Sequence, residues 1–413
     1  MQRRRFLQSS AAFGAWSFAS IHAAPELARR KLVVILLRGA VDGLSVVAPY
    51  GDRNYAASRP NLALAPPGAE DGLLKLDSLF GLHPALARLK PYWDQGSLGF
   101  VHASGSPDPT RSHFDAQDYL ESGTPGRKST PDGWMNRLLT AMPSGKSGKS
   151  APTRAVNMGA TPPRIFAGPA NVASLGLGPK AMDSKAIDDP AMQAALAKLY
   201  AGDDALGRSY RDATEGRGEM RKSMQAGMAG GGVDPSADAG APSARSFAAD
   251  AGRLGTLIRN DPHTQLAFTS VGGWDTHVNQ GAAKGQLANR LASLGEGIDA
   301  LAKGLGDALA DTVIVVLSEF GRTVRQNGSN GTDHGRGNVI WLLGGPVAGG
   351  QMIGEWPGLE TAALADGRDL AVVTDFRQVL RPILQRHLGV NDEGLARVFP
   401  ALPVGPATRV LRS

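Results

Sequence analysis

Short motifs that contain histidine and acidic residues stand next to the apolar segments of this sequence. Gly-Gly-Trp-Asp-Thr-His ends with Asp275 and His277, which are two residues apart and can both turn toward one ion from a loop. Asp333 and His334 are adjacent in Gly-Thr-Asp-His-Gly-Arg-Gly, just ahead of another apolar segment. Carboxylate oxygen and imidazole nitrogen are ligands of Zn²⁺, Mn²⁺ and similar ions. These residues therefore predict a metal site.

Two further carboxylates follow apolar segments directly. Asp42 ends Arg-Gly-Ala-Val-Asp, and Glu319 lies in Ser-Glu-Phe-Gly-Arg. Each has a plain alternative, since Asp-Gly after a strand is commonly a turn and Glu319 could form a surface ion pair with Arg322. Their placement nevertheless makes both candidates for metal ligands.

Ser112 opens a predicted helix. Asp115, three residues later, completes a pattern similar to a capping box. Ser112 is therefore either a simple N-cap or a nucleophile at a helix N-terminus, where free N–H groups favour an anion. The local sequence leaves both interpretations open.

The elements that must position these residues follow from hydrophobic patterning. Continuous or alternating apolar runs predict strands, and helical periodicity appears between them. The alternation predicts an α/β fold, with a mostly parallel central sheet and helices on both faces. Ligands of such sheets bind beyond the carboxyl ends of the strands, so the motifs above are expected at one edge. The predicted strands are 31–37, 98–103, 264–271, 312–317 and 338–343, and the predicted helices are 84–93, 113–122, 286–305 and 375–388.

Composition excludes several function classes. The chain has 413 residues, no cysteine and a formal charge of +6, so disulfides and thiolate metal sites are excluded. The basic residues are scattered, which argues against nucleic-acid binding. No segment after the N-terminus is long and apolar enough to predict a membrane span. His83, His102 and His387 are expected to be structural histidines, and His263 belongs to no pattern.

The N-terminal residues predict export. Arg-Arg-x-Phe-Leu begins at Arg3, and a mildly apolar segment follows. This is typical of a twin-arginine signal peptide over residues 1–24, recognised by the twin-arginine export machinery. The expected location is periplasmic or secreted, with a single domain over 25–413. The alternative is a basic amphipathic helix on a cytoplasmic protein. A Gly/Ala/Ser-rich insertion at about 212–245 is expected to be a loop, or else a lid over the site.

Five motifs together resemble the alkaline phosphatase–sulfatase superfamily, and more closely its twin-arginine-exported branch, domain-of-unknown-function family 1501. The motifs lie at residues 37–43, 111–123, 272–277, 318–323 and 331–337. The resemblance implies an alkaline-phosphatase-like fold and two metals at the carboxyl edge of the sheet. It implies one metal site from Asp275, His277 and His334 and another from Asp42, Ser112 and Glu319.

One residue departs from the superfamily pattern. Phe320 stands where the superfamily often has histidine, so the second metal site lacks a ligand unless Asp333 supplies it. The enzyme would then work with two metals, one metal or none.

The resemblance implies an exported hydrolase of phosphate or sulfate esters, small or polymeric, with Ser112 as nucleophile. The cofactor would be a divalent metal. Zn or Mn is expected, and Ca or Mg is the alternative. Arg322, Arg336 or Arg38 would hold the transferring group by charged hydrogen bonds. One alternative is a non-catalytic binding or assembly protein of the cell envelope on the same fold. Another is a metal-dependent mutase or transferase.

Overall fold

The computed structural model describes residues 26–143, 151–159, 162–178, 189–224, 238, 241–403, 405 and 408–413. The predicted signal peptide, residues 1–24, lies outside the described residues. No helix of the described part of the chain is long and apolar enough to cross a membrane.

The first strand, β1 (Lys31–Leu37), explains why the domain has two hydrophobic layers. All seven of its residues are buried. Leu32, Val34 and Leu36 point into one core, whereas Val33, Ile35 and Leu37 point into the other. Successive strand residues face opposite sides of a sheet, so an unbroken apolar run requires cover on both faces.

The main sheet has nine strands in the order β11–β5–β10–β9–β1–β8–β6–β7, with β12 paired to β5. All of its pairings are parallel except those of β10, which runs antiparallel to both β5 and β9. The start of β10 therefore lies at the edge where its neighbours end: Asn338 pairs with Ser104 near the end of β5. The strands other than β1 are β5 (Leu98–Gly105), β6 (Ala155–Met158), β7 (Ala173–Leu175), β8 (Leu266–Val271), β9 (Thr312–Ser318), β10 (Asn338–Leu343), β11 (Met352–Ile353) and β12 (Thr374–Asp375).

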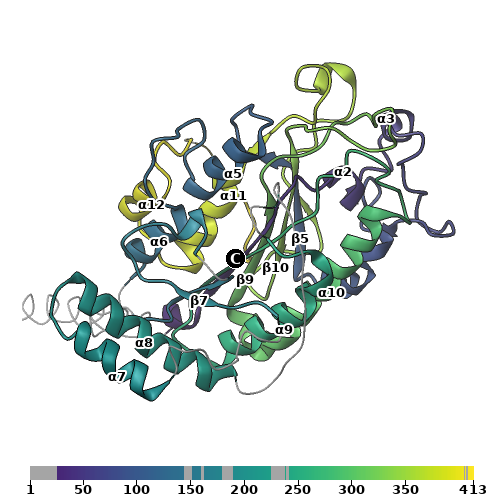
Figure 1. The fold of residues 1–413 in the computed structure, drawn as a ribbon. Helices are drawn as coiled ribbons and strands as arrows, with labels where there is room; N and C mark the ends of the chain where they lie inside the picture. The colour runs from purple at the N-terminus through teal and green to yellow at the C-terminus, as the bar shows by residue number, and fades with distance from the viewer. Residues whose placement is uncertain are drawn as a thin grey trace, which may run out of the picture.

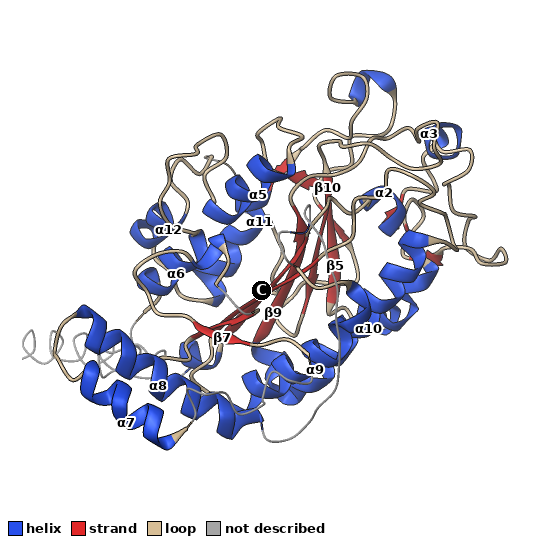
Figure 2. Cartoon of the chain, viewed as in Figure 1, coloured by secondary structure: helices blue, strands red, loops and turns tan. Residues whose placement is uncertain are grey.

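Helices cover both faces of this sheet (Figures 1 and 2). Four helical elements and their apolar residues form the core on one face: η1 (Pro84–Leu89), α4 (Lys90–Asp94), α9 (Ala244–Asn260) and α10 (Gln286–Leu305). The other face is covered by α5 (His113–Ser122), α6 (Trp134–Ala141), α11 (Phe376–Pro382), the π-helical turn η8 (Ile383–His387) and α12 (Asp392–Val398). The predicted α/β class, with helices on both faces of a mostly parallel sheet, is confirmed.

Smaller elements surround this framework. A three-stranded sheet has the order β2 (Val47–Ala48), β4 (Gly81–Leu82), β3 (Leu74–Lys75). Helices α7 (Pro190–Leu199) and α8 (Ala205–Met224) project from the lower left of the body in Figure 1. The remaining short helices are α2 (Gly43–Val46), α3 (Arg53–Ser58), η2 (Arg164–Phe166), η6 (Gly306–Asp311) and η7 (Thr361–Ala363).

Most predicted element boundaries agree with the structure, and the departures are local. Helices 113–122 and 286–305 are reproduced as α5 and α10. The helix predicted over 84–93 is a 3₁₀ turn, Pro84–Leu89, followed by α4, which begins at Lys90 and has Pro91 in its first turn. Within the predicted insertion at 212–245, residues up to 224 continue α8 and residues from 244 begin α9. Residues 225–237, 239 and 240 lie outside the described residues.

Candidate metal centre

Histidine and aspartate side chains from three separate segments meet at the edge of the sheet where β1, β8 and β9 end. Asp275 and His277 follow β8, and His113 is the first residue of α5. His334 precedes β10, and the reversed direction of that strand brings this residue to the same edge. Gly39 has a positive φ of 105°, and a Cβ there would lie 2.9 Å from the backbone nitrogen of Asp275. A glycine is therefore needed for the loops after β1 and β8 to approach this closely.

His113, Asp275 and His334 form a group whose ligand atoms all lie within 4.8 Å of one another. The Nε2 atoms of His113 and His334 are 3.1 Å apart. The Oδ1 atom of Asp275 is 3.2 Å from Nε2 of His334 and 3.7 Å from Nε2 of His113. Atoms about 2.0–2.2 Å from a tetrahedral ion lie about 3.3–3.6 Å apart, so these spacings fit a single ion.

His277 extends the group. Its Nε2 atom is 2.9 Å from Nε2 of His334 and 3.0 Å from Oδ1 of Asp275. The structure thus brings together Asp275, His277 and His334, the three residues grouped from sequence, and adds His113.

Each of the three imidazoles is held from behind by an acceptor. Nδ1 of His113 is 2.8 Å from the buried carboxylate of Glu319, and Nδ1 of His277 is 3.1 Å from Asp333. His334 donates from Nδ1 to the carbonyl oxygen of Arg111 at 2.9 Å. These contacts place Glu319 and Asp333 behind histidine rings, in the position of groups that orient metal-bound histidines.

This arrangement of protons is the main indication of a cation. A neutral imidazole carries one proton, and an acceptor at Nδ1 holds that proton on the far side of the ring. The Nε2 lone pair of His334 then faces those of His113 and His277 and the carboxylate of Asp275, which is repulsive unless a positive charge lies among them. Three nitrogen donors and one carboxylate suit a borderline ion such as Zn²⁺.

Without a metal, protons supply part of that charge. Burial of the His113 ring lowers its pKa, but the carboxylates of Asp275 and Glu319 outweigh burial and raise the pKa to about 9. Burial likewise opposes ionisation of Asp275, yet His113, His334 and Arg322 hold its pKa far below the usual range. The carboxylate is therefore ionised across the physiological range.

Arg322 lies behind Asp275, with a fully buried side chain. It donates to Oδ1 of Asp275 at 2.5 Å and to the carbonyl oxygens of Gly39 and Ala40, each at 2.6 Å. It also donates to the carbonyl oxygens of Trp274 and Thr332 at 3.1 Å. One guanidinium thus joins the loops after β1 and β8 to the segment that carries His334.

Ser112 is exposed at the N-cap of α5, and its side chain makes no capping hydrogen bond. Its neighbours on both sides contact the histidine cluster: His113 through its ring and Arg111 through its carbonyl oxygen. The structure therefore does not show the N-cap role for its hydroxyl.

Phe320 forms an apolar wall beside the cluster. Its ring centroid is 4.9 Å from that of His113 and 5.1 Å from that of His334, and the residue is buried. The aromatic ring thus packs against two of the imidazoles and offers no ligand atom to an ion beside them.

Asp42 has a different environment from the one expected. Its carboxylate accepts two hydrogen bonds from the guanidinium of Arg59, at 2.6 and 3.0 Å, and others from Ser45 and Gln280. Burial raises the pKa of Asp42, but Arg59 and these donors lower it overall. Within the described residues, the group of possible metal ligands does not include Asp42, and a buried arginine already compensates this carboxylate.

Arg38 is also bound in the interior. Its guanidinium donates to Gln117 at 2.5 Å and pairs with Glu121 at 2.8 Å. Gln117 in turn donates to Glu319 at 3.0 Å. Arg38 thus supports the residues behind His113, although its Nε–H is buried without an acceptor.

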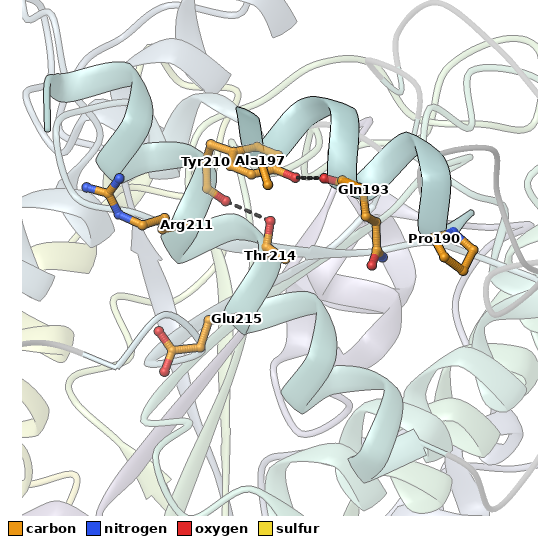
Figure 3. A pocket seen from close by; sticks show the side chains of 8 residues that line it. Pro190, Gln193, Ala197, Tyr210, Arg211, Thr214 and Glu215 are labelled. Carbon is orange, nitrogen blue, oxygen red and sulfur yellow. Dashed lines mark hydrogen bonds between the residues drawn. The ribbon is translucent and has the colours of Figure 1, made fainter. Parts of the chain in front are cut away.

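A pocket of about 630 Å³ lies elsewhere, between α7 and α8, and Figure 3 shows its lining. Its polar groups are joined to one another: Thr214 donates to the carbonyl oxygen of Tyr210, at 2.9 Å. None of its lining residues belongs to the histidine cluster. Among the described residues, the one group that could hold a metal ion lies at the sheet edge instead.

His113 is the cluster residue that the sequence motifs did not single out. Its position in the sequence was the one indication of a role at the site. His113 directly follows the candidate nucleophile, Ser112, at the start of a helix that comes after a predicted strand. A single histidine there is indistinguishable from a helix-terminal histidine until Asp275 and His334 are seen to lie beside it.

The sequence model of a family described as "Protein of unknown function (DUF1501)" matches residues 97–399. That span includes the four cluster residues. A comparison with curated proteins gave no match.

Solved structures with partial likeness include Ps i-CgsB in complex with k-i-k-neocarrahexaose, with 11% sequence identity, 90% of this chain and 76% of that chain covered, and a TM-score of 0.41. A 2-O GAG sulfatase has 12% identity, coverage of 88% and 71%, and a TM-score of 0.34. Alkaline phosphatase from the Antarctic bacterium TAB5 has 12% identity, coverage of 76% and 90%, and a TM-score of 0.31. These TM-scores are low, so the fold class rests on the order and direction of the strands.

Proposed function

We propose that this chain, which belongs to the DUF1501 family, is a metal-dependent hydrolase of phosphate or sulfate esters that uses Ser112 as its nucleophile. The observation that carries the proposal is the group of His113, Asp275 and His334, whose ligand atoms lie within 4.8 Å of one another. Nε2 of His277 lies 2.9 Å from that of His334, and an acceptor lies at Nδ1 of each of the three imidazoles. Such a set of donors is arranged for a cation.

His113, Asp275 and His334 would hold the ion, and His277 would complete the set. Zinc is the first choice, because nitrogen donors predominate and Ca²⁺ and Mg²⁺ prefer oxygen. A divalent ion there would polarise the ester oxygens and lower the pKa of the attacking hydroxyl. One ion is proposed, because Phe320 packs against two of the rings and Asp42 is bound by Arg59.

The chain's own residues supply the rest of the reaction. Ser112 stands at the N-terminus of a ten-residue helix, where N–H groups favour the negative ester group. Its oxygen forms a bond to phosphorus or sulfur while the bond to the leaving oxygen breaks, and the hydroxyl proton ends on the leaving alcohol. Water then cleaves the serine ester and releases phosphate or sulfate with the remaining proton.

The direct test measures metal and turnover together. Purified wild-type chain is expected to hold about one equivalent of zinc or manganese, His334→Ala to lose most of it, and His263→Ala, an exposed loop histidine, to retain it. Ser112→Ala should keep the metal and lose hydrolysis of p-nitrophenyl phosphate or p-nitrophenyl sulfate. No metal in wild-type protein after reconstitution would refute the proposal.

A non-catalytic binding role on the same fold is the second candidate, and the packing of Phe320 against the cluster favours it. In that case the metal would be structural and Ser112→Ala would leave the biological effect unchanged. The same variant therefore separates the two roles.

Export by the twin-arginine pathway remains part of the proposal. It is supported by the Arg-Arg-x-Phe-Leu motif that begins at Arg3. Replacement of Arg3 and Arg4 by lysine should retain the protein in the cytoplasmic fraction. Periplasmic recovery of that variant would contradict this part of the proposal.

A further inference from the structure

Arg336 is a cation without a carboxylate partner beside the candidate metal centre. No ion pair joins it to an acidic residue of the described chain, and its Nε–H is buried with no hydrogen-bond acceptor. Within the described residues, the one hydrogen bond of its guanidinium joins Nη2 to the carbonyl oxygen of Pro107 at 3.5 Å. A buried donor without a partner calls for an explanation, since such groups are normally satisfied by protein, water or ligand.

The neighbouring arginines are already engaged. Arg322 donates to carbonyl oxygens and to Asp275. Arg38 donates to Gln117 and forms an ion pair with Glu121. Arg111 is paired with Asp369 and Asp366, and Arg368 donates to the carbonyl oxygen of His334 at 3.0 Å. Arg38 also keeps a buried Nε–H without an acceptor, but its guanidinium is paired with Glu121. Of the three arginines that the sequence offered for the transferring group, Arg336 is the one that no ion pair within the described residues joins to a carboxylate.

The position of Arg336 relates it to the nucleophile. Its Nη2 atom reaches Pro107, and the ring of His334 reaches the carbonyl oxygen of Arg111. Both contacts fall on the loop that joins β5 to α5 and ends at Ser112. Arg336 and His334 therefore approach that loop together from the segment ahead of β10.

The backbone of Arg336 is fixed. Its carbonyl oxygen accepts from the backbone nitrogen of Gly321 at 2.9 Å, and the next residue, Gly337, donates to the carbonyl oxygen of Leu370 at 2.8 Å. A Cβ at Gly337 would come within 2.6 Å of the carbonyl oxygen of Ala371. The backbone from which the side chain extends is therefore in place before a ligand arrives, which reduces the entropy lost on binding.

We infer that Arg336 binds the tetrahedral oxyanion of the substrate, phosphate or sulfate, while it is presented to Ser112. A guanidinium matches this chemistry because its planar N–H groups can donate in pairs to two oxygens of one anion. The inference rests on the proposed function, since it assigns the group that recognises the ester in that same site.

The test is titration of the zinc-loaded, purified chain with inorganic phosphate and, separately, inorganic sulfate by calorimetry. Arg336→Gln should weaken binding of the preferred anion at least tenfold. Arg336→Lys should lose less, because it keeps the charge but not the paired donors. Arg325→Gln is the matched control, because Arg325 is exposed on a neighbouring turn. Zinc content and thermal unfolding are measured on every variant.

The outcomes are distinct. Equal anion affinity in wild type, Arg336→Lys and Arg336→Gln would overturn the inference and leave the metal proposal standing, as would wild-type protein that holds zinc but binds neither anion. A wild-type protein without zinc, but with anion binding that depends on Arg336, would support the anion site and refute the proposed metallohydrolase. Tighter binding of one anion identifies the class of ester.

Discussion

The carboxylate of Glu319, which is fully buried, lies 2.8 Å from Nδ1 of His113, and the opposite nitrogen of that ring faces Asp275 and His334. Glu319 also accepts from the backbone nitrogen of Gly39 at 2.8 Å. A residue at the end of β9 therefore fixes the orientation of a ring at the start of α5. The geometry of the cluster thus depends on residues that lie behind it.

Replacement of Glu319 by glutamine should weaken metal binding by about 10–100-fold, because the imidazole loses the charged acceptor that orients it and makes it more basic. The measurement is competition for zinc with a chelator of known affinity. Asp115→Asn, which removes a carboxylate from the same helix at its pair with Lys128, is the matched control and should bind zinc normally. Unchanged zinc affinity in Glu319→Gln would show that the contact has no role in metal binding.

Arg322→Lys should reduce both stability and zinc affinity. A single ammonium cannot reach the four carbonyl oxygens and the carboxylate that the buried guanidinium serves. We expect a loss of about 2–4 kcal/mol in the free energy of unfolding, measured with urea on the metal-free protein.

Zinc affinity separates positioning from stability in this variant. If Arg322 positions Asp275, the folded Arg322→Lys protein should bind zinc about tenfold or more weakly. Arg325→Lys should change neither quantity. A destabilised variant with normal zinc affinity would limit Arg322 to a structural role.

Asp42→Ala should destabilise the fold without removing the metal. The substitution leaves the guanidinium of Arg59 buried and uncompensated, which costs about 3–5 kcal/mol of unfolding free energy. The double variant Asp42→Leu with Arg59→Met removes both charges and should recover part of that loss. Unfolding in urea and zinc content are the two measurements. Loss of zinc from folded Asp42→Ala protein would instead support the metal-ligand role expected from sequence.

Stability should fall as pH decreases from about 6.5 toward 5, before most carboxylates titrate. Burial lowers the pKa of His83 and of His102 to about 4, against about 6.5 in the unfolded chain. The unfolded state then binds more protons, so each neutral histidine contributes stability that is complete above pH about 6.5 and is lost as pH falls toward about 4. Each of the two histidines makes the free energy of unfolding change by up to about 1.4 kcal/mol per pH unit.

The slope is measured by urea unfolding at a series of pH values. His102→Asn should lower the slope by up to about 1.4 kcal/mol per pH unit, which corresponds to one proton. This change is expected whatever the effect of the substitution on stability at neutral pH. His263→Asn is the control on an exposed loop residue. The raised pKa of His113 has the opposite sign: its stabilisation is complete below about pH 6.5 and is lost as pH rises through about 9, so it adds no slope in the acid window. A flat profile between pH about 6.5 and 5 would contradict the prediction.

The sequence by itself determined the framework of this protein. The run Lys31–Leu37 was predicted as a strand covered on both sides because an unbroken apolar segment has no face to turn toward water. Helices α5 and α10 were predicted with their observed bounds. The family was identified from short motifs, and the match over residues 97–399 confirms it. The strand and the helices are local properties, and the period and polarity of a short segment are sufficient to encode them.

Only the tertiary structure decided which side chains meet. The reversed direction of β10 brings His334 to the edge where β8 ends, and hydrophobic patterning carries no information about strand direction. Glu319 and His113 are 206 residues apart in the chain, so no local pattern could show that one holds the other. Asp42 and Glu319 looked equivalent in sequence, as carboxylates beyond strand ends. Their roles differ because Arg59 reaches one and His113 the other, and such partners are fixed by packing over long sequence distances.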